Sequence, residues 1–115
     1  MRKKQVKRYN DGIVRIYREK GRRSNFNAKQ NVSVLDDMDF IVKLAYEELS
    51  KREQDIEFAE QNDFSLSVKI KTRFVDGIDN KCKAVIEGQL YDVKYMDKTK
   101  TDIYLYMEEV RKIDS

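Results

Sequence analysis

The chain has 115 residues, and its 24 Lys and Arg against 21 Asp and Glu give a formal net charge of +3. That length leaves room for one hydrophobic core and not for two, so we expect a single domain over residues 1–115. With no His and one Cys, these residues exclude a Cys/His metal cluster, a Ser-His-Asp triad, a Cys-His dyad and a disulfide framework.

Charge is divided unevenly along the chain. Residues 1–30 carry eleven Lys and Arg against two acids, residues 31–63 carry three against ten, and residues 64–115 carry ten against nine. This basic front and acidic middle fit two interpretations. They are either ordinary solvated faces or a contact in which the basic segment of one copy meets the acidic segment of another.

The N-terminal third predicts a flexible arm, a strand and a loop. Residues 1–9 are basic with little apolar content, so we expect them to be poorly ordered unless a partner holds them. The turn signal Asn10-Asp11-Gly12 precedes a strand over Gly12–Arg18, and the polar, basic stretch Lys20–Asn31 predicts an exposed loop. Phe26 in this loop either folds back on the domain or contacts a partner.

The acidic middle predicts a strand followed by a helix or loop. Alternation in Phe40–Tyr46 indicates a strand. The order Ser50-Lys51-Arg52-Glu53 is a capping box, which predicts that a helix starts here. The body Lys51–Gln61 offers only Ile56, Phe58 and Ala59 as apolar side chains. We therefore expect a surface helix or a mobile loop that lacks an apolar face to hold it on the core.

The remaining chain predicts four more strands. A period of two from Phe64 to Phe74 indicates a half-buried strand with a basic outer face of Lys69, Lys71 and Arg73. The three other strands are expected over Lys81–Glu87, Leu90–Met96 and Asp102–Val110, with Gly88-Gln89 as the tight turn between the first two. Tyrosines on the last two strands either line the barrel or form a partner surface; they are Tyr91, Tyr95, Tyr104 and Tyr106.

Together these elements predict a mainly β fold: a small antiparallel six-stranded β-barrel with one short helix or long loop between strands 2 and 3. Cys82 is expected to be a small buried hydrophobe in a reducing compartment. No window reaches the roughly 18 apolar residues of a membrane span, so we expect no membrane partner. Glu47 and Glu48 have no cleft or metal motif beside them. The sequence therefore predicts no enzyme, no catalytic residue, no metal and no cofactor.

Three stretches carry a resemblance to a known family. They are LAYEELSKREQDIEFAEQNDFSLSVKIKTRF at residues 44–74, VIEGQLYDV at residues 85–93 and TDIYLYMEE at residues 101–109. They resemble the head closure proteins of tailed bacteriophages, also called head–tail adaptor or stopper proteins. The most similar parts are Ser50–Asp55 and Gly88–Val93, and NDGIVRIYRE near the N-terminus is similar to versions from phages of Gram-positive hosts.

The resemblance implies a small β-barrel that assembles as a homo-oligomeric ring in the phage neck, beneath the portal and its adaptor. There it retains packaged DNA and offers a platform to a tail completion or tail tube protein, in a virion assembled in the host cytoplasm. In this family the connection between the second and third barrel strands projects toward the channel axis. The matching positions here are Leu49–Asp63.

We accordingly expect a mobile gating or inter-subunit segment made of Ser50, Lys51, Arg52, Glu53, Gln54, Asp55, Ile56, Glu57 and Phe58. Its acidic lining would repel phosphates, so that DNA passes without sequence-specific binding. Docking to a partner is expected at Arg18, Lys20, Arg22, Arg23, Phe26, Tyr104 and Tyr106. The alternative function is a nucleic-acid-binding barrel of the OB kind, since Lys69, Lys71 and Arg73 share a strand face.

Overall fold

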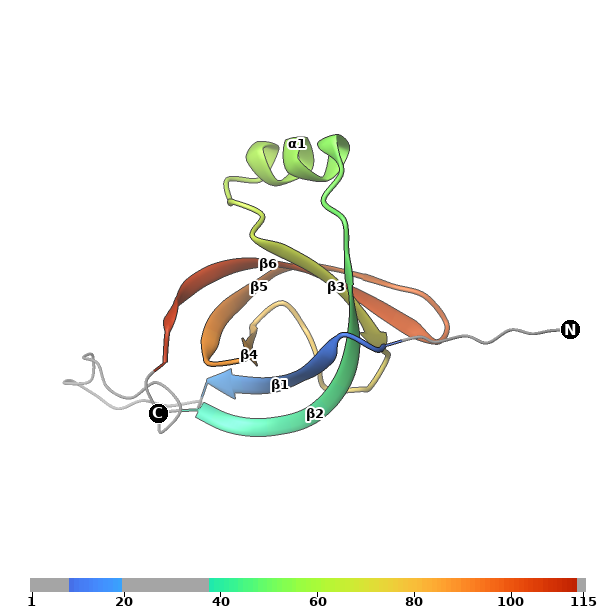
Figure 1. The fold of residues 1–115 in the computed structure, drawn as a ribbon, viewed down its shortest axis with the longest axis vertical. Helices are drawn as coiled ribbons and strands as arrows, with labels where there is room; N and C mark the ends of the chain where they lie inside the picture. Colours follow the sequence, from blue (N-terminus) through green and yellow to red (C-terminus); the bar gives the residue numbers. More distant parts are fainter. Residues whose placement is uncertain (1–8, 20–37, 114–115) are drawn as a thin grey trace, which may run out of the picture.

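Six antiparallel strands close into a barrel, with one helix standing on the connection between the second and third strands (Figure 1). The structure, a computed structural model, describes residues 9–19 and 38–113. Its elements are β1 (Gly12–Glu19), β2 (Met38–Leu49), α1 (Glu53–Gln61), β3 (Val68–Arg73), β4 (Cys82–Ile86), β5 (Gln89–Lys98) and β6 (Asp102–Lys112). The predicted mainly β fold, with six strands and a short helix between strands 2 and 3, is confirmed.

The strands follow one another around the barrel in the order β1-β2-β3-β6-β5-β4, and β4 pairs with β1 to close it. Closure leaves no open sheet edge, which removes the row of unpaired backbone groups on which other chains add strands. Two of the predicted segments, the basic arm over residues 1–8 and the loop Lys20–Asn31, lie outside the described residues.

Alternate residues of each strand fill the barrel. Val14 and Ile16 of β1 and Ile103, Leu105 and Met107 of β6 are all fully buried, as the period of two requires. These side chains form one core cluster with residues of β3, β4 and β5. The barrel therefore has a packed interior of its own, separate from the helix above it.

One polar side chain lies inside this core. Thr72 of β3 is fully buried, and its hydroxyl donates to the carbonyl oxygen of Ala45 at 2.7 Å. The hydrogen bond satisfies a group that would otherwise be costly to bury. It also ties β3 to β2 at the end of their pairing that lies away from the helical connection.

Among the strand boundaries that differ from the sequence prediction, two change a connection between elements. β3 begins at Val68 and not at Phe64, because residues 64–67 serve to lead the chain from the helix back to the sheet. The β4–β5 turn is Glu87-Gly88 and not Gly88-Gln89, since Gln89 already pairs with Ile86. Both turn residues have positive φ, 49° and 77°, which is the geometry of a two-residue hairpin loop that follows the twist of its strands.

The tyrosines predicted on the last two strands divide between the two faces of the sheet. Tyr91 packs against the core cluster. A shift of register between Val93 and Tyr95 turns Tyr95 outward, where it pairs with Tyr106 of β6. A bulge of this kind adds one residue to one strand and so changes the face on which the next side chains lie. Tyr91 thus fits the lining interpretation, and the partner-surface interpretation stays a prediction.

Candidate functional site

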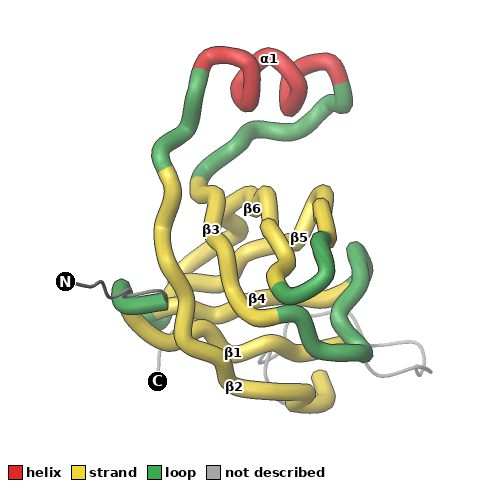
Figure 2. Tube along the Cα trace, turned by 90° about the vertical axis from the view of Figure 1, so that its right-hand side faces the viewer, coloured by secondary structure: helices red, strands yellow, loops and turns green. Residues whose placement is uncertain are grey.

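The connection from β2 to β3 rises away from the barrel and carries α1 at its far end (Figure 2). The helix begins after Arg52, whose backbone N–H donates to the Asp55 carboxylate at 3.0 Å. The predicted capping box at Ser50–Glu53 is therefore wrong by two residues. Asp55 lies in the third helical position counted from Arg52, and its carboxylate takes the capping role that the prediction assigned to Glu53.

A buried ion pair fastens the helix to the sheet. The Lys69 ammonium of β3 lies 3.1 Å from the Asp55 carboxylate, and the two side chains are only 10% and 11% exposed. The same ammonium lies 5.1 Å from the centre of the Tyr106 ring. Lys69 was predicted on an exposed basic face, and the structure corrects this, because α1 covers it. A charged pair removed from water needs these additional partners to offset its lost hydration.

The carboxyl group of this pair is held in its charged form. Burial by itself would raise the pKa of Asp55, but the hydrogen bonds from the Arg52 N–H and the Lys69 ammonium outweigh it. The net result is a pKa below the ordinary 3.8. At neutral pH the pair is therefore ionised on the Asp55 side and keeps both of its hydrogen bonds.

An aromatic cluster forms the second attachment of α1. Phe58 lies 4.8 Å from Tyr95, 6.0 Å from Tyr106 and 6.4 Å from Phe64, measured between ring centres. Ala59 beside it is 1% exposed. The expectation that this segment lacks an apolar face to hold it is therefore wrong. The hydrophobic side chains are few, but they meet rings supplied by β5, β6 and the 64–67 stretch.

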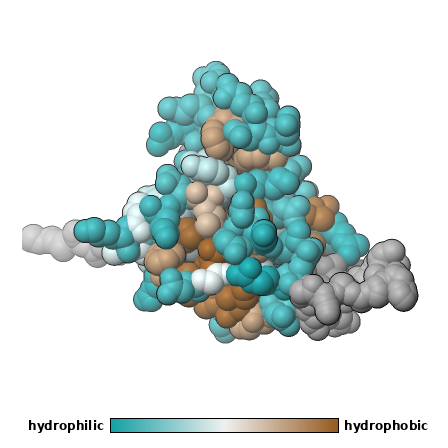
Figure 3. Space-filling view, turned by 180° about the vertical axis from the view of Figure 1, so that it is seen from behind, coloured by the Kyte–Doolittle hydropathy of each residue, from teal (hydrophilic) through white to brown (hydrophobic). Residues whose placement is uncertain are grey.

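The opposite side of α1 forms an acidic outer stripe, which consists of Glu53, Ile56, Glu57 and Glu60. Positions three and four apart lie on one face of a helix, so these four side chains are contiguous. All four are exposed, Ile56 by 42%. None of the three carboxylates has an ion-pair partner among residues 9–19 and 38–113. Figure 3 shows this end of the molecule as hydrophilic on the outside, with hydrophobic side chains beneath it.

The other predicted segment residues occupy the stem of the connection or its solvent side. Lys51 donates to the carbonyl oxygen of Ser67 at 3.1 Å, which links the two legs of the connection. Ser50 and Gln54 are exposed. The structure thus brings Asp55 and Phe58 together with the sheet and leaves the glutamates of the helix facing water.

Of the predicted docking residues, the structure describes three. Arg18 is already engaged within the chain, with Nη1 3.1 Å from Asp79 and Nη2 2.6 Å from the carbonyl oxygen of Gly77. Tyr106 lies beneath α1, so only Tyr104 stays half-exposed without such a role. The others, Lys20, Arg22, Arg23 and Phe26, lie outside the described residues.

A second surface was missed by sequence reasoning. Arg15 of β1 and Lys43 of β2 are direct cross-strand neighbours on the outside of the barrel, and both are exposed. The next outward positions on either side bring the exposed side chains Ile13 (43%) and Phe40 (54%). We call Ile13, Arg15, Lys43 and Phe40 the β1–β2 face. Each residue is unremarkable in its own strand, and only the register brings the two cations together.

The described residues hold no group of three or more Asp, Glu or Cys side chains placed to bind a metal ion. In the same part of the chain, no helix has the length and apolar content needed to cross a membrane. Cys82 is 1% exposed, and burial raises the pKa of its thiol. This thiol is therefore a poor nucleophile in the folded protein.

No family model matches the chain, and no curated protein matches its sequence.

Proposed function

We propose that the protein is a structural component of the head–tail connector of a tailed bacteriophage, which closes the portal channel to retain packaged DNA and offers the tail a platform. The sequence resembles head closure proteins at Ser50–Asp55 and Gly88–Val93. The observation that carries the proposal is the projecting β2–β3 connection with an acidic helix at its end (Figure 2). In the family that the sequence resembles, this connection reaches toward the channel axis.

The attachment of α1 suits a movable part. Its contacts are one ion pair and one aromatic cluster, and none of its residues belongs to the core cluster of the barrel. Release of the helix exposes Phe58, Tyr95 and Tyr106 but leaves Leu105 and Met107 packed. Local opening of this kind needs much less free energy than unfolding the barrel.

The charge of the helix suits passage of DNA. Glu53, Glu57 and Glu60 point away from the barrel and lack cations among the described residues. Such a surface repels phosphates, so a channel lined by it allows DNA to slide without binding. The partners implied are further copies of the chain in a ring, the portal or its adaptor above, and a tail completion or tail tube protein below.

The nucleic-acid-binding alternative finds less support in the same residues. Of the three cations that suggested it, Lys69 is buried against Asp55, and Lys71 lies 3.4 Å from Glu47. Of the three cations, only Arg73 is both exposed and without an ion-pair partner among the described residues. A binding groove for single strands needs several free cations and stacking rings on one surface.

Binding measurements separate the two functions. The purified chain is added to portal–adaptor rings of the phage that encodes it and, separately, to single-stranded DNA over a series of salt concentrations. We expect retention on the rings and no strong binding to DNA. Tight DNA binding with a steep loss of affinity as salt rises, and no binding to the rings, would replace head closure by nucleic-acid recognition.

A variant of the chain provides the control. Because Leu49 pairs directly with Lys69, a short Gly-Ser linker can replace residues 50–66 without straining the barrel. This variant should still bind the rings, since the barrel supplies the docking platform. The comparison tells whether ring binding depends on the barrel or on the helical connection.

A further inference from the structure

The β1–β2 face carries two neighbouring positive charges, which lower the stability of the sheet. Arg15 and Lys43 lie directly opposite each other, and neither has an ion-pair partner among residues 9–19 and 38–113. Like charges in this position destabilise a sheet. An exposed Ile13 and an exposed Phe40 flank the pair, so the face combines two large apolar side chains with two cations that are unpaired within the described residues.

The outer stripe of α1 has the opposite character. Glu53 and Glu57 are four residues apart, an arrangement of like charges that weakens an isolated helix. The stripe has one exposed apolar side chain, Ile56, set among three carboxylates. The two surfaces thus share a pattern of apolar groups beside uncompensated charge, with the sign reversed.

The dimensions of the two surfaces also agree. Ile13 to Tyr17 on β1 spans about 13 Å at the usual strand rise. Glu53 to Glu60 on α1 spans about 10 Å at the usual helical rise. One helix laid on the sheet can therefore place carboxylates over Arg15 and Lys43 and bring Ile56 against Phe40 or Ile13.

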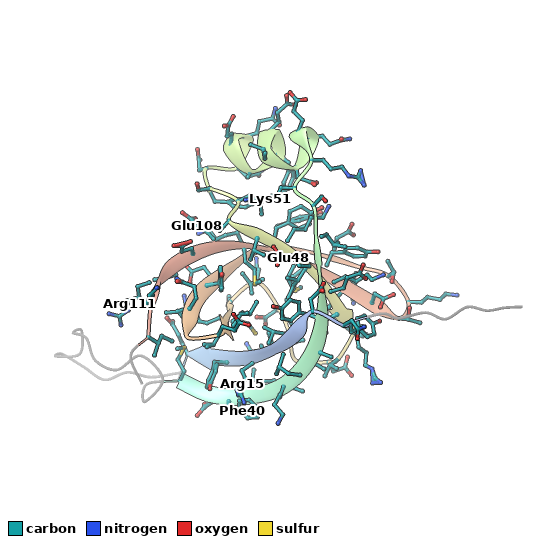
Figure 4. All side chains as sticks on the ribbon, viewed as in Figure 1. Arg15, Phe40, Glu48, Lys51, Glu108 and Arg111 are labelled. Carbon is teal, nitrogen blue, oxygen red and sulfur yellow. The ribbon has the colours of Figure 1, made fainter. Side chains whose placement is uncertain are left out.

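The two surfaces of one copy cannot meet. Arg15 and Phe40 lie at the end of the barrel away from α1 (Figure 4). Two complementary surfaces at opposite ends of a molecule join successive copies head to tail, and such contacts give rings where the rotation closes. Within the described residues, one copy does not compensate the charges of either surface.

We propose that the β1–β2 face binds the outer stripe of α1 from a second copy of this chain. The carboxylates of Glu53, Glu57 and Glu60 pair with Arg15 and Lys43, and Ile56 packs against the flanking apolar side chains. A helix of nine residues covers less area than a standard interface, so the contact is weak in a single pair and sensitive to salt. The inference supplies the contact between copies for the proposed ring and rests on that proposal only for closure of the ring. In copies that make this contact the neighbour covers the stripe, and the stripe lines the channel only where α1 is released from that neighbour.

The test uses two variants that each remove one surface. Arg15→Glu with Lys43→Glu reverses the face, and Glu53→Gln with Glu57→Gln and Glu60→Gln neutralises the stripe. All five residues are exposed. Thermal unfolding monitored by circular dichroism is used to check that each variant folds. A third variant, Lys94→Glu with Lys100→Glu, reverses two exposed cations elsewhere on the barrel and serves as the matched control.

Sedimentation equilibrium at high protein concentration is measured at low and at high salt. We expect the parent chain and the control variant to associate at low salt and to dissociate as salt rises. Each single-surface variant should associate at least about tenfold more weakly. A mixture of the two variants in equal amounts should form a dimer and nothing larger, because one intact stripe meets one intact face.

Three results would overturn the contact: no association of the parent chain at low salt, association of both variants at the level of the parent, or failure of the mixture to dimerise. In each case retention of the chain on portal–adaptor rings keeps the proposed function and removes only this contact. If the chain also fails to bind the portal–adaptor rings, the contact and the proposed function are both refuted.

Discussion

The Asp55–Lys69 pair gives the sharpest test of how α1 is attached. Asp55→Ala removes two hydrogen bonds, from the Lys69 ammonium at 3.1 Å and the Arg52 N–H at 3.0 Å, and leaves a buried ammonium without its counter-charge. Breaking one side of a buried pair costs about 3–5 kcal/mol. The lower value applies here, since Lys69 keeps the Tyr106 ring beneath it. We expect about 3 kcal/mol, or about a hundredfold in the opening of α1.

A variant of Lys69 tests the other side of the ion pair. Lys69→Met keeps the apolar stem and should cost about 2 kcal/mol, because the carboxylate still accepts from the Arg52 N–H. The double variant should cost about 3 kcal/mol, less than the sum, since neither charge is left alone. As a control, Glu47→Ala breaks the more exposed pair with Lys71 and should cost less than about 1 kcal/mol.

Amide hydrogen exchange measures this opening directly. Useful reporters are the N–H groups of Asn62 and Phe64, which donate to Phe58 and Ala59 at the end of the helix. Faster exchange at these amides in Asp55→Ala, with unchanged protection in β6, is the expected pattern. An unchanged rate at Asn62 and Phe64 would refute the account in which the ion pair holds α1.

Three further predictions concern pH, the β4–β5 turn and the thiol. The lowered pKa of Asp55 means that the stabilisation from its carboxylate is complete above about pH 4, the ordinary value, and is lost as pH falls through the lower value of the folded state. Amide exchange in α1, corrected for intrinsic rates, should therefore become faster only in acid. The same acid-dependent rise in Asp55→Asn would contradict this assignment. Glu87→Asn should increase the free energy of unfolding by about 0.5 kcal/mol, because Glu87 has φ 49° and Asn adopts that conformation more readily. The urea midpoint measures the change, and a lower midpoint would argue against the turn geometry. Cys82 should react with a thiol reagent only as fast as the barrel opens, and immediate labelling of the native protein would show that the thiol is not enclosed.

Much of the barrel was predictable, because each strand carries its own period of two. The alternation of Ile103, Leu105 and Met107 with polar or aromatic neighbours is enough to locate β6 and its buried face. Local patterns of this kind depend on a few adjacent residues. The order of the strands in the barrel depends on which of them pair, and the sequence supplies no such local signal.

The attachment of α1 was not predictable for the same reason. Asp55 and Lys69 are fourteen residues apart and belong to different kinds of element, so no period joins them. Tyr95 reaches Phe58 only because the register shifts before it on β5. The cap was misplaced because Ser50 and Glu53 have the required spacing, and only the observed start of the helix gives the role to Asp55.

DNA retention in assembled particles tests the proposed closure most directly. Phage particles are assembled with the chain in which a Gly-Ser linker replaces residues 50–66, and packaged DNA is compared with that in particles carrying the parent chain. Particles shown to contain the linker variant in the neck should lose their DNA. The amount of the variant in the particles is measured as well, because removal of α1 also removes the proposed contact between copies. Full retention of DNA by particles that contain this variant would show that the helical connection does not close the channel.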